Sequence, residues 1–177
     1  MDELTVEWIA AEKLDETIHE IIGRYGQGVL QLVYSYVGNK AIAEDLTQEI
    51  FIKCYRSLHT YKGQAQLKTW LWRIAINHCK DFLKSWYNRN VISTDNHSVL
   101  DSSQKRTVEQ SIIQKDDDAK LAFAVMNLPI IYREVILLHY YEELAIKEIS
   151  TILDVKVNTI KTRLRKAKAL LKESLEE

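Results

Sequence analysis

The chain of 177 residues contains very little proline, glycine and cysteine. It has one proline and five glycines, whereas a turn-rich β-sandwich or a phosphate-cradling α/β enzyme normally needs more of both. Its two cysteines, Cys54 and Cys79, form no CxxC pair, which argues against a disulfide scaffold and a structural zinc site. Because 46% of the residues are hydrophobic, a packed core is still possible, and the composition favours an all-helical protein.

Export and membrane signals are also missing from the sequence. The first residues carry no basic start followed by an apolar run. No uninterrupted apolar stretch approaches the roughly 18 residues of a membrane span. We therefore expect a soluble, cytoplasmic protein.

The motifs of common enzyme classes are absent as well. The sequence has no HExxH, GxSxG or P-loop pattern. The cysteines and the five histidines lack metal-ligand spacing, and Gly23, Gly26 and Gly28 are in the wrong order for a dinucleotide-binding turn. We expect a protein that is not an enzyme, with no catalytic residue, metal site, cofactor or small-molecule substrate.

Charged residues, in contrast, are plentiful and unevenly distributed behind a net charge of −1. Residues 1–20 contain seven acidic side chains and one lysine. Residues 53–89 contain eight basic side chains against Asp81 alone, and residues 156–172 contain seven basic side chains and no acid. Two separated basic blocks in a neutral chain indicate two contact points on one polyanion, although each block alone could equally be a solvated helix face.

Hydrophobic periodicity predicts two helical regions. The first contains three amphipathic helices, over residues 14–36, 40–58 and 66–87. From about residue 90 to 118 the periodicity fades into Ser, Asp, Asn and Gln, which is linker composition. A second helical set runs from 119 to about 174 and is interrupted at Leu128-Pro129, where proline fits a first helical turn. The expected fold is all-α, with two small helical domains joined by a flexible linker.

The third expected helix has an apolar face and a basic face. Its apolar face carries Leu71, Ala75, His78, Phe82 and Trp86, and its opposite face carries Arg73, Asn77, Lys80 and Lys84. Trp70 projects beside the basic stripe and Trp72 lies at the edge of the apolar face, so the two cannot both enter one core. An exposed Trp flanked by basic residues is typical of a base-stacking platform, with packing of Trp70 on another helix as the alternative. We expect His78 to be a core histidine.

The C-terminal residues have the pattern of a helix-turn-helix. A short helix over about 145–153, with Ala145, Ile149 and Ile152 inward, is followed by Asp154-Val155-Lys156 and a longer helix. One face of the longer helix is apolar and another is basic, which is the geometry that enters a DNA major groove. We expect its first turns to reach base edges and its later basic residues to contact phosphates.

Three motifs, in order, resemble those of the extracytoplasmic-function (ECF) group of bacterial sigma factors over residues 18 to 174. AEDLTQEIF at 43–51 is similar to the segment that docks on the clamp helices of the polymerase β′ subunit. TWLWRIAIN at 69–77, with Asp81, is similar to the helix that reads the −10 element as single strand. Leu128-Pro129 and TIKTRL at 159–164 are similar to the domain that binds the −35 element as duplex.

The resemblance implies a sigma factor that binds core RNA polymerase, at the β′ clamp helices and the β flap, recognises promoter DNA and helps to melt it. The implied polymerase contacts are Asp45, Leu46, Gln48, Glu49 and Phe51. The implied −10 contacts are Tyr61, Lys62, Gly63, Gln64, Trp70, Arg73, Asn77, Lys80 and Lys84. The implied −35 contacts are Asn158, Thr159, Lys161, Thr162, Arg163, Arg165 and Lys166. The family also implies an anti-sigma partner, often membrane-anchored, that occludes both domains.

Composition and the resemblance together predict four segments. They are an acidic N-terminal extension at 1–17, a sigma region 2 domain at 18–89, a linker at 90–118 and a region 4 helix-turn-helix domain at 119–177. The acidic extension matches no motif, and a solvated tail, a fourth helix and a shield against free DNA all remain open for it.

The sequence departs from the family pattern at three positions. Leu67 stands where Phe is frequent, Asp154 replaces a frequent Gly in the turn, and Lys156 replaces a Ser-type cap. Asp tolerates the left-handed conformation, so we expect a small cost in the turn. Loss of the capping oxygen costs about 1 kcal/mol.

A second interpretation of the sequence is a regulator that binds duplex DNA through its helix-turn-helix without being a polymerase subunit. Residues 18–88 would then serve for dimerisation or effector binding. Tight duplex binding in the absence of polymerase would distinguish this regulator from a sigma factor.

Overall fold

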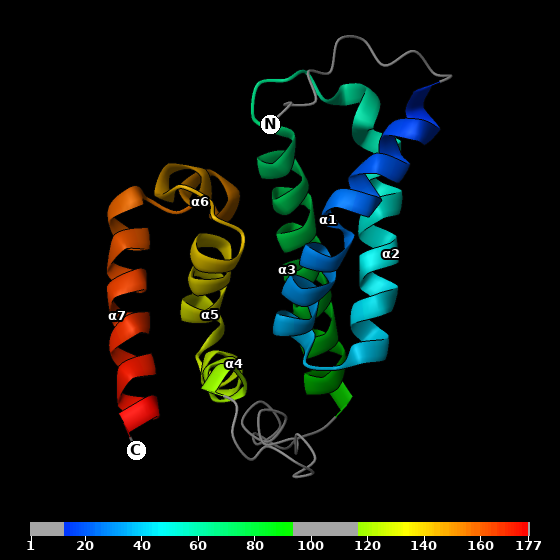
Figure 1. Cartoon of the computed structure of the whole chain (residues 1–177). Coiled ribbons are helices and arrows are strands. Elements are labelled where there is room, and N and C mark those ends of the chain that lie inside the picture. Colours follow the sequence, from blue (N-terminus) through cyan, green and yellow to red (C-terminus); the bar gives the residue numbers. More distant parts are fainter. Residues whose placement is uncertain (1–12, 94–116, 177) are drawn as a thin grey trace.

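The structure, a computed structural model, describes residues 13–93 and 117–176 (Figure 1). The first range forms α1 (Leu14–Val37), α2 (Lys40–Ser57), the 3₁₀ turn η2 (Leu58–Thr60) and α3 (Leu67–Ser93). The second range forms α4 (Asp117–Asn127), α5 (Ile130–Ile136), the π-helical turn η4 (Leu137–Tyr141), α6 (Ile146–Leu153) and α7 (Val157–Glu176). No strand occurs in the described residues, and the expected all-α fold is confirmed.

Local signals set the junction between α1 and α2. Gly38 adopts φ 63° after α1, and its backbone N–H donates to the carbonyl of Tyr34 at 2.8 Å, which ends the helix. The side chain of Asn39 then accepts a hydrogen bond from the N–H of Ile42 at 3.0 Å and caps α2. These two residues join the helices through a minimal turn, so α1 and α2 pack against each other as neighbours.

The helices reach further into the expected linker than the sequence pattern predicts. The α3 helix continues to Ser93, and α4 begins at Asp117. Asn90 remains helical, and its side-chain amide donates to the carbonyl of Trp86 at 2.8 Å. Exposed polar residues of this kind leave no hydrophobic period in the sequence, which is why the prediction stopped short. Residues 1–12 and 94–116 lie outside the described part of the chain.

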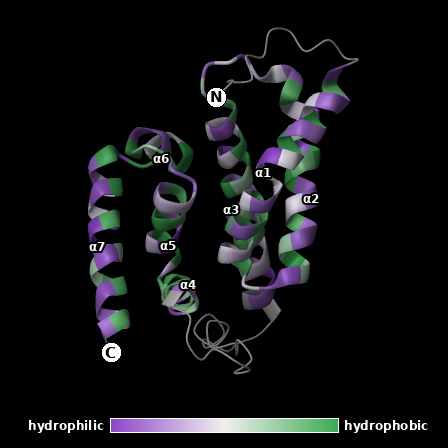
Figure 2. Cartoon of the chain, viewed as in Figure 1, coloured by the Kyte–Doolittle hydropathy of each residue, from purple (hydrophilic) through white to green (hydrophobic). Residues whose placement is uncertain are grey.

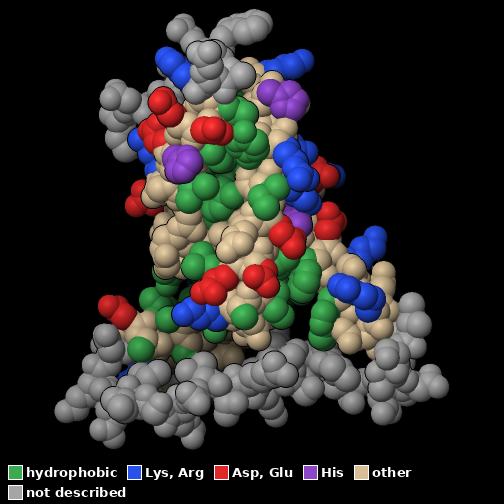
Figure 3. Space-filling view, turned by 90° about the vertical axis from the view of Figure 1, so that its right-hand side faces the viewer, with side chains coloured by type: hydrophobic (Ala, Val, Ile, Leu, Met, Phe, Trp, Pro, Cys, Tyr) green, Lys and Arg blue, Asp and Glu red, His purple; other side chains and the backbone are tan. Residues whose placement is uncertain are grey.

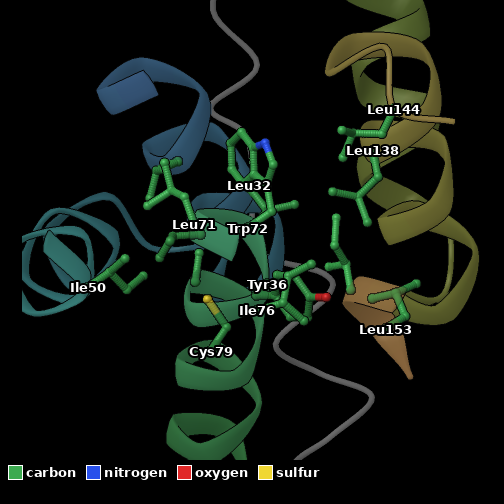
Figure 4. Close-up of a cluster of buried hydrophobic side chains, with 14 of the residues drawn as sticks. Leu32, Tyr36, Ile50, Leu71, Trp72, Ile76, Cys79, Leu138, Leu144 and Leu153 are labelled. Carbon is green, nitrogen blue, oxygen red and sulfur yellow. The ribbon is translucent and has the colours of Figure 1, made fainter. Parts of the chain in front are cut away.

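The hydrophobic core extends across both helical domains. Along each helix hydrophobic and hydrophilic residues alternate, as amphipathic packing requires (Figure 2). Trp72, Ile76 and Tyr36 of the first domain face Leu138, Leu144 and Leu153 of the second domain (Figure 4). The prediction that Trp72 lies at the edge of an apolar face is wrong, because the second domain covers α3 from another side and buries this residue completely.

The second domain contains the expected helix-turn-helix, formed by α6, a three-residue turn and α7. Asp154 ends α6 in the left-handed conformation, at φ 55°, which bears out the expectation that Asp tolerates this turn. Ile149 and Ile152 are buried as predicted, but Ala145 is exposed because it is the N-cap of α6. The buried residue at this end of the helix is Leu144.

None of the helices in the described ranges is both long and apolar enough to cross a membrane.

Candidate nucleic-acid interface

The outer face of α3 carries the predicted basic stripe. Arg73, Asn77, Lys80 and Lys84 are all exposed. The neighbouring positions Leu71, Ala75, Ile76 and Cys79 are buried, so packing on two other sides fixes which face α3 presents to solvent. Phe82 and Trp86 of the expected apolar face are only half-buried.

An aromatic pair stands at the N-terminal end of this stripe. The ring centroids of Tyr61 and Trp70 lie 5.3 Å apart, with their planes inclined by 46°. The hydroxyl of Tyr61 donates to the carbonyl of Ala65, which fixes the ring in the loop before α3. Lys62, Gly63 and Gln64 are exposed in that loop, and Gly63 adopts φ 68°, which favours glycine. The structure therefore brings a basic loop and two aromatic rings to one end of the α3 stripe.

The recognition helix α7 presents most of its predicted DNA contacts to solvent. Asn158, Thr159, Lys161, Thr162, Arg165 and Lys166 are exposed, while Ile160, Leu164 and Ala167 anchor the helix on the opposite side. A groove of about 560 Å³ runs between α7 and Ile131 and Tyr132 of α5. Five of the predicted contacts, Thr159, Thr162, Arg163, Arg165 and Lys166, line this groove.

The α2 helix presents a surface of different character. Asp45, Gln48 and Glu49 are exposed, and acidic and hydrophobic side chains lie next to one another on this side of the molecule (Figure 3). Leu46 and Phe51 are buried in the core, so the structure gives these two predicted polymerase contacts a supporting role instead. Ile52 is 50% exposed and lies on the same face of α2 as Asp45. The motif at 43–51 did not identify this residue. Its spacing of seven residues from Asp45 is the sequence signal that could have found it.

His78 links this α2 surface to α3. Its Nε2 lies 2.7 Å from Oε2 of Glu49, so the residue is not the plain core histidine that the sequence predicts. Its Nδ1 is buried and has no hydrogen-bond partner in the described part of the chain. The contact holds the exposed Glu49 carboxylate in a defined position on α2.

A buried carboxylate that the sequence did not reveal joins the two domains. Glu134 of α5 is only 3% exposed. It accepts a hydrogen bond from the hydroxyl of Tyr36 at 2.5 Å and pairs with Arg163 at 3.2 Å and Lys80 at 3.5 Å. Burial, and then the charge of Glu134, raises the pKa of Tyr36 well above its usual value. One carboxylate thus contacts α1 and α3 of the first domain and α7 of the second.

Two more polar contacts cross the same interface. The guanidinium of Arg133 donates to the carbonyl of Ser35 in α1, and burial lowers its pKa. Lys68 donates to the backbone carbonyl of Glu142 at 2.5 Å and pairs with its carboxylate at 3.6 Å. Burial raises the pKa of Glu142, and Lys68 opposes that shift. The domain interface therefore combines buried charged contacts at Arg133 and Glu134 with apolar packing.

The remaining reactive side chains are placed for packing. Cys54 and Cys79 are buried, and burial raises the pKa of both thiols to about 12, which keeps them protonated near neutral pH. Within residues 13–93 and 117–176, no three His, Cys, Asp or Glu side chains gather in a way that could hold a metal ion.

Family comparisons match the two domains separately. Sigma-70 region 2 matches residues 21–88, and Sigma-70 region 4 matches residues 119–171. Among curated proteins, the chain is 31% identical to the ECF RNA polymerase sigma factor SigM of Bacillus subtilis, with 88% of this chain and 93% of that protein covered. It is 29% identical to SigW of the same organism over 89% of this chain and 88% of that protein.

Solved structures share the fold. The sigma factor RpoE of Bartonella quintana, solved in complex with the anti-sigma factor NepR, matches with a TM-score of 0.75 at 20% identity. That match covers 91% of this chain and 98% of RpoE. CnrH, solved in complex with the cytosolic domain of CnrY, matches with a TM-score of 0.65 at 18% identity and covers 92% of this chain and 89% of CnrH.

Proposed function

The chain belongs to the ECF family of RNA polymerase sigma factors, and from this premise we propose which of its surfaces makes each contact of a promoter-recognition subunit. Sigma factors are not enzymes in the usual sense, because the polymerase performs the chemistry. The observation that carries the proposal is the separation of one acidic and apolar surface on α2 from two basic surfaces on α3 and α7. A protein that joins another protein to DNA needs surfaces of these two kinds.

The α2 surface is assigned to core polymerase, at the β′ clamp helices. Asp45, Gln48 and Glu49 offer acidic and polar groups to a basic partner, and Ile52 adds an exposed apolar anchor one turn further along the same face. Leu46 and Phe51 support this surface from the core. An acidic surface in a DNA-binding protein is explained if it faces protein, because phosphates would repel it.

The −10 element is assigned to the loop and stripe at α3. Tyr61 and Trp70 supply rings on which an unstacked base can stack, each stacked base being worth roughly 1–3 kcal/mol. Lys62, Gly63 and Gln64 form the adjacent pocket edge, and flipping a base into it costs a few kcal/mol that stacking and pocket contacts offset. Arg73, Asn77, Lys80 and Lys84 then follow the strand along α3.

The −35 element is assigned to α7. The exposed residues near its start, Asn158, Thr159, Lys161 and Thr162, are placed to reach base edges in a major groove. Arg163, Arg165 and Lys166 follow one turn later and reach base edges or phosphates. The second domain as a whole is assigned to the β flap.

An anti-sigma factor is the regulatory partner that we infer from the family. The related fold of RpoE was solved with the anti-sigma factor NepR, which supports a partner of the same class here. The chain would act in the cytoplasm, where core polymerase is found, and its anti-sigma factor could be anchored in the membrane.

Transcription with purified components tests this proposal. Core RNA polymerase and the chain would be incubated with a pool of random-sequence DNA, and transcribed fragments would be selected. A sigma factor yields fragments that share −10 and −35 elements, and initiation depends on adding the chain. Tight duplex binding without polymerase and no initiation with it would favour the regulator interpretation, which the similarity to sigma factors over 88% of the chain does not support.

A further inference from the structure

His78 of α3 touches the α2 surface through one of that surface's acidic residues. Its Nε2 lies 2.7 Å from Oε2 of Glu49. The His78 side chain is 12% exposed, whereas the Glu49 side chain is 57% exposed. A largely enclosed imidazole ring therefore holds a carboxylate that faces solvent, at the boundary between the core of the first domain and the surface assigned to core polymerase.

The chemistry of this contact fixes one end of the carboxylate and leaves the other end open. An ionised carboxylate only accepts hydrogen bonds, so Nε2 of His78 carries the proton and donates it to Oε2 of Glu49. Within the described ranges, Oε1 of Glu49 has no hydrogen-bond or ion-pair partner. The first oxygen is thus positioned by α3, and the second can accept from a Lys or Arg of a partner protein.

Glu49 differs in this respect from the other polar residues of the α2 surface. In the part of the chain that the structure describes, the side chains of Asp45 and Gln48 make no hydrogen bond or ion pair. They must lose rotamer freedom when a partner binds, and that loss weakens binding. A Glu49 side chain that is already held loses less, so the carboxylate at this one position is organised in advance for docking.

Packing alone does not explain a histidine at position 78. Its Nδ1 is buried and has no hydrogen-bond partner among residues 13–93 and 117–176. The neighbouring α3 residues Ala75 and Cys79 are completely buried, so this side of the helix already packs well. A buried polar atom without a partner lowers stability, and an apolar side chain of similar size would avoid that loss. What favours histidine here is the hydrogen bond that Nε2 donates at the surface.

We propose that His78 is a positioning residue for the docking of core RNA polymerase, because it sets the Glu49 carboxylate in the orientation that the polymerase binds. This role rests on the assignment of the α2 surface to polymerase. His78 acts through Glu49 rather than by direct contact with the partner. Its effect therefore belongs to the affinity for polymerase and not to the stability of the fold.

Substitutions at His78 test this role by the affinity of labelled protein for core polymerase. His78→Leu removes the donor and should weaken binding by about twofold to tenfold, the cost of immobilising one free side chain. Its midpoint of chemical denaturation should equal or exceed that of the wild type. His78→Gln carries an amide nitrogen at nearly the place of Nε2 and should bind like the wild type. Equal losses of affinity in the Leu and Gln variants would contradict the proposal.

A double-mutant cycle shows whether His78 acts through Glu49. In a Glu49→Ala background there is no carboxylate to position, so adding His78→Leu should change the affinity by less than about twofold. A purely structural histidine would give the same fold-change in both backgrounds. That outcome would overturn the proposal.

Further variants keep the test specific. His59→Leu makes the same substitution at an exposed histidine of η2, outside the α2 surface, and should leave the affinity unaltered. If His78→Leu does not fold, His78→Asn replaces it, because the shorter Asn amide cannot reach Glu49 as the Gln amide does. Folded His78→Leu or His78→Asn protein with wild-type affinity would overturn the proposal while the sigma function stands. If folded wild-type protein does not bind core polymerase, the proposed function itself fails.

Discussion

Residues that are close neighbours along α3 take different environments. Trp72 is completely buried between the two domains, whereas Trp70, two positions earlier, is half-buried against Tyr61. Lys80 keeps 43% of its side chain exposed while its amine reaches Glu134. One helix therefore provides a core residue, a candidate base-stacking residue and a basic residue paired with Glu134, on three sides.

Trp70 carries the first prediction. Trp70→Ala removes one ring of the aromatic pair. The holoenzyme should then bind a single-stranded −10 oligonucleotide with a binding free energy weaker by roughly 1–3 kcal/mol. Because duplex contacts through α7 are untouched, promoter opening should slow more than closed-complex formation weakens. Fluorescence of a base analogue in the −10 element measures opening. Trp70→Phe keeps a ring and should retain most of the activity, and equal losses in both variants would argue against stacking.

Among the structural elements, the helix-turn-helix depends on a single residue of its turn. Asp154 adopts the left-handed conformation at φ 55°. This conformation has a higher energy for residues other than Gly, Asn and Asp. Asp154→Gly should maintain the free energy of unfolding or raise it by up to about 1 kcal/mol. Asp154→Val should lower it by about 1–3 kcal/mol. Chemical denaturation checks both values, and a stable Val variant would mean that the turn adopts another conformation.

The recognition helix α7 carries the next prediction. Arg165→Ala removes an exposed guanidinium group that lines the groove beside α5. If Arg165 contacts a phosphate, binding to −35 duplex should weaken and the salt slope should fall by about 1. If it reads a base, a loss of about 1–3 kcal/mol should be confined to one position of the element. Lys120→Ala, which removes an exposed lysine of α4 outside the recognition helix, is the control, and an unchanged Arg165→Ala affinity removes Arg165 from the interface.

Elements and exposed faces could be predicted because their signals are local. The period of apolar residues located α1, α2 and α7, and the stripe from Arg73 to Lys84 emerged from helical spacing alone. The AEDLTQEIF motif at 43–51 was less reliable for the roles of individual residues. It grouped Phe51 with Asp45, although the two lie on different sides of α2 and only Asp45 is exposed.

At the scale of the whole molecule, the contact between the domains could not be predicted from the sequence. The helical pattern placed Trp72 only at the edge of an apolar face, but α3 is covered from two directions and Trp72 is completely buried. Glu134 reads as an ordinary charged residue, since its partners Tyr36, Lys80 and Arg163 lie 98, 54 and 29 residues away. Long-range pairings of this kind leave no periodic signal, and only the folded chain reveals them.

The measurement that tests the account most directly is the binding of fluorescently labelled protein to core RNA polymerase, followed by anisotropy. The account predicts tight binding by the wild type and clearly weaker binding by Asp45→Lys, which reverses a charge on the exposed α2 surface. Glu20→Lys makes the same charge change on α1 and should bind like the wild type. Circular dichroism would establish that all three proteins are folded. No binding by the folded wild type, or equal affinity of the Asp45→Lys protein, would contradict the account.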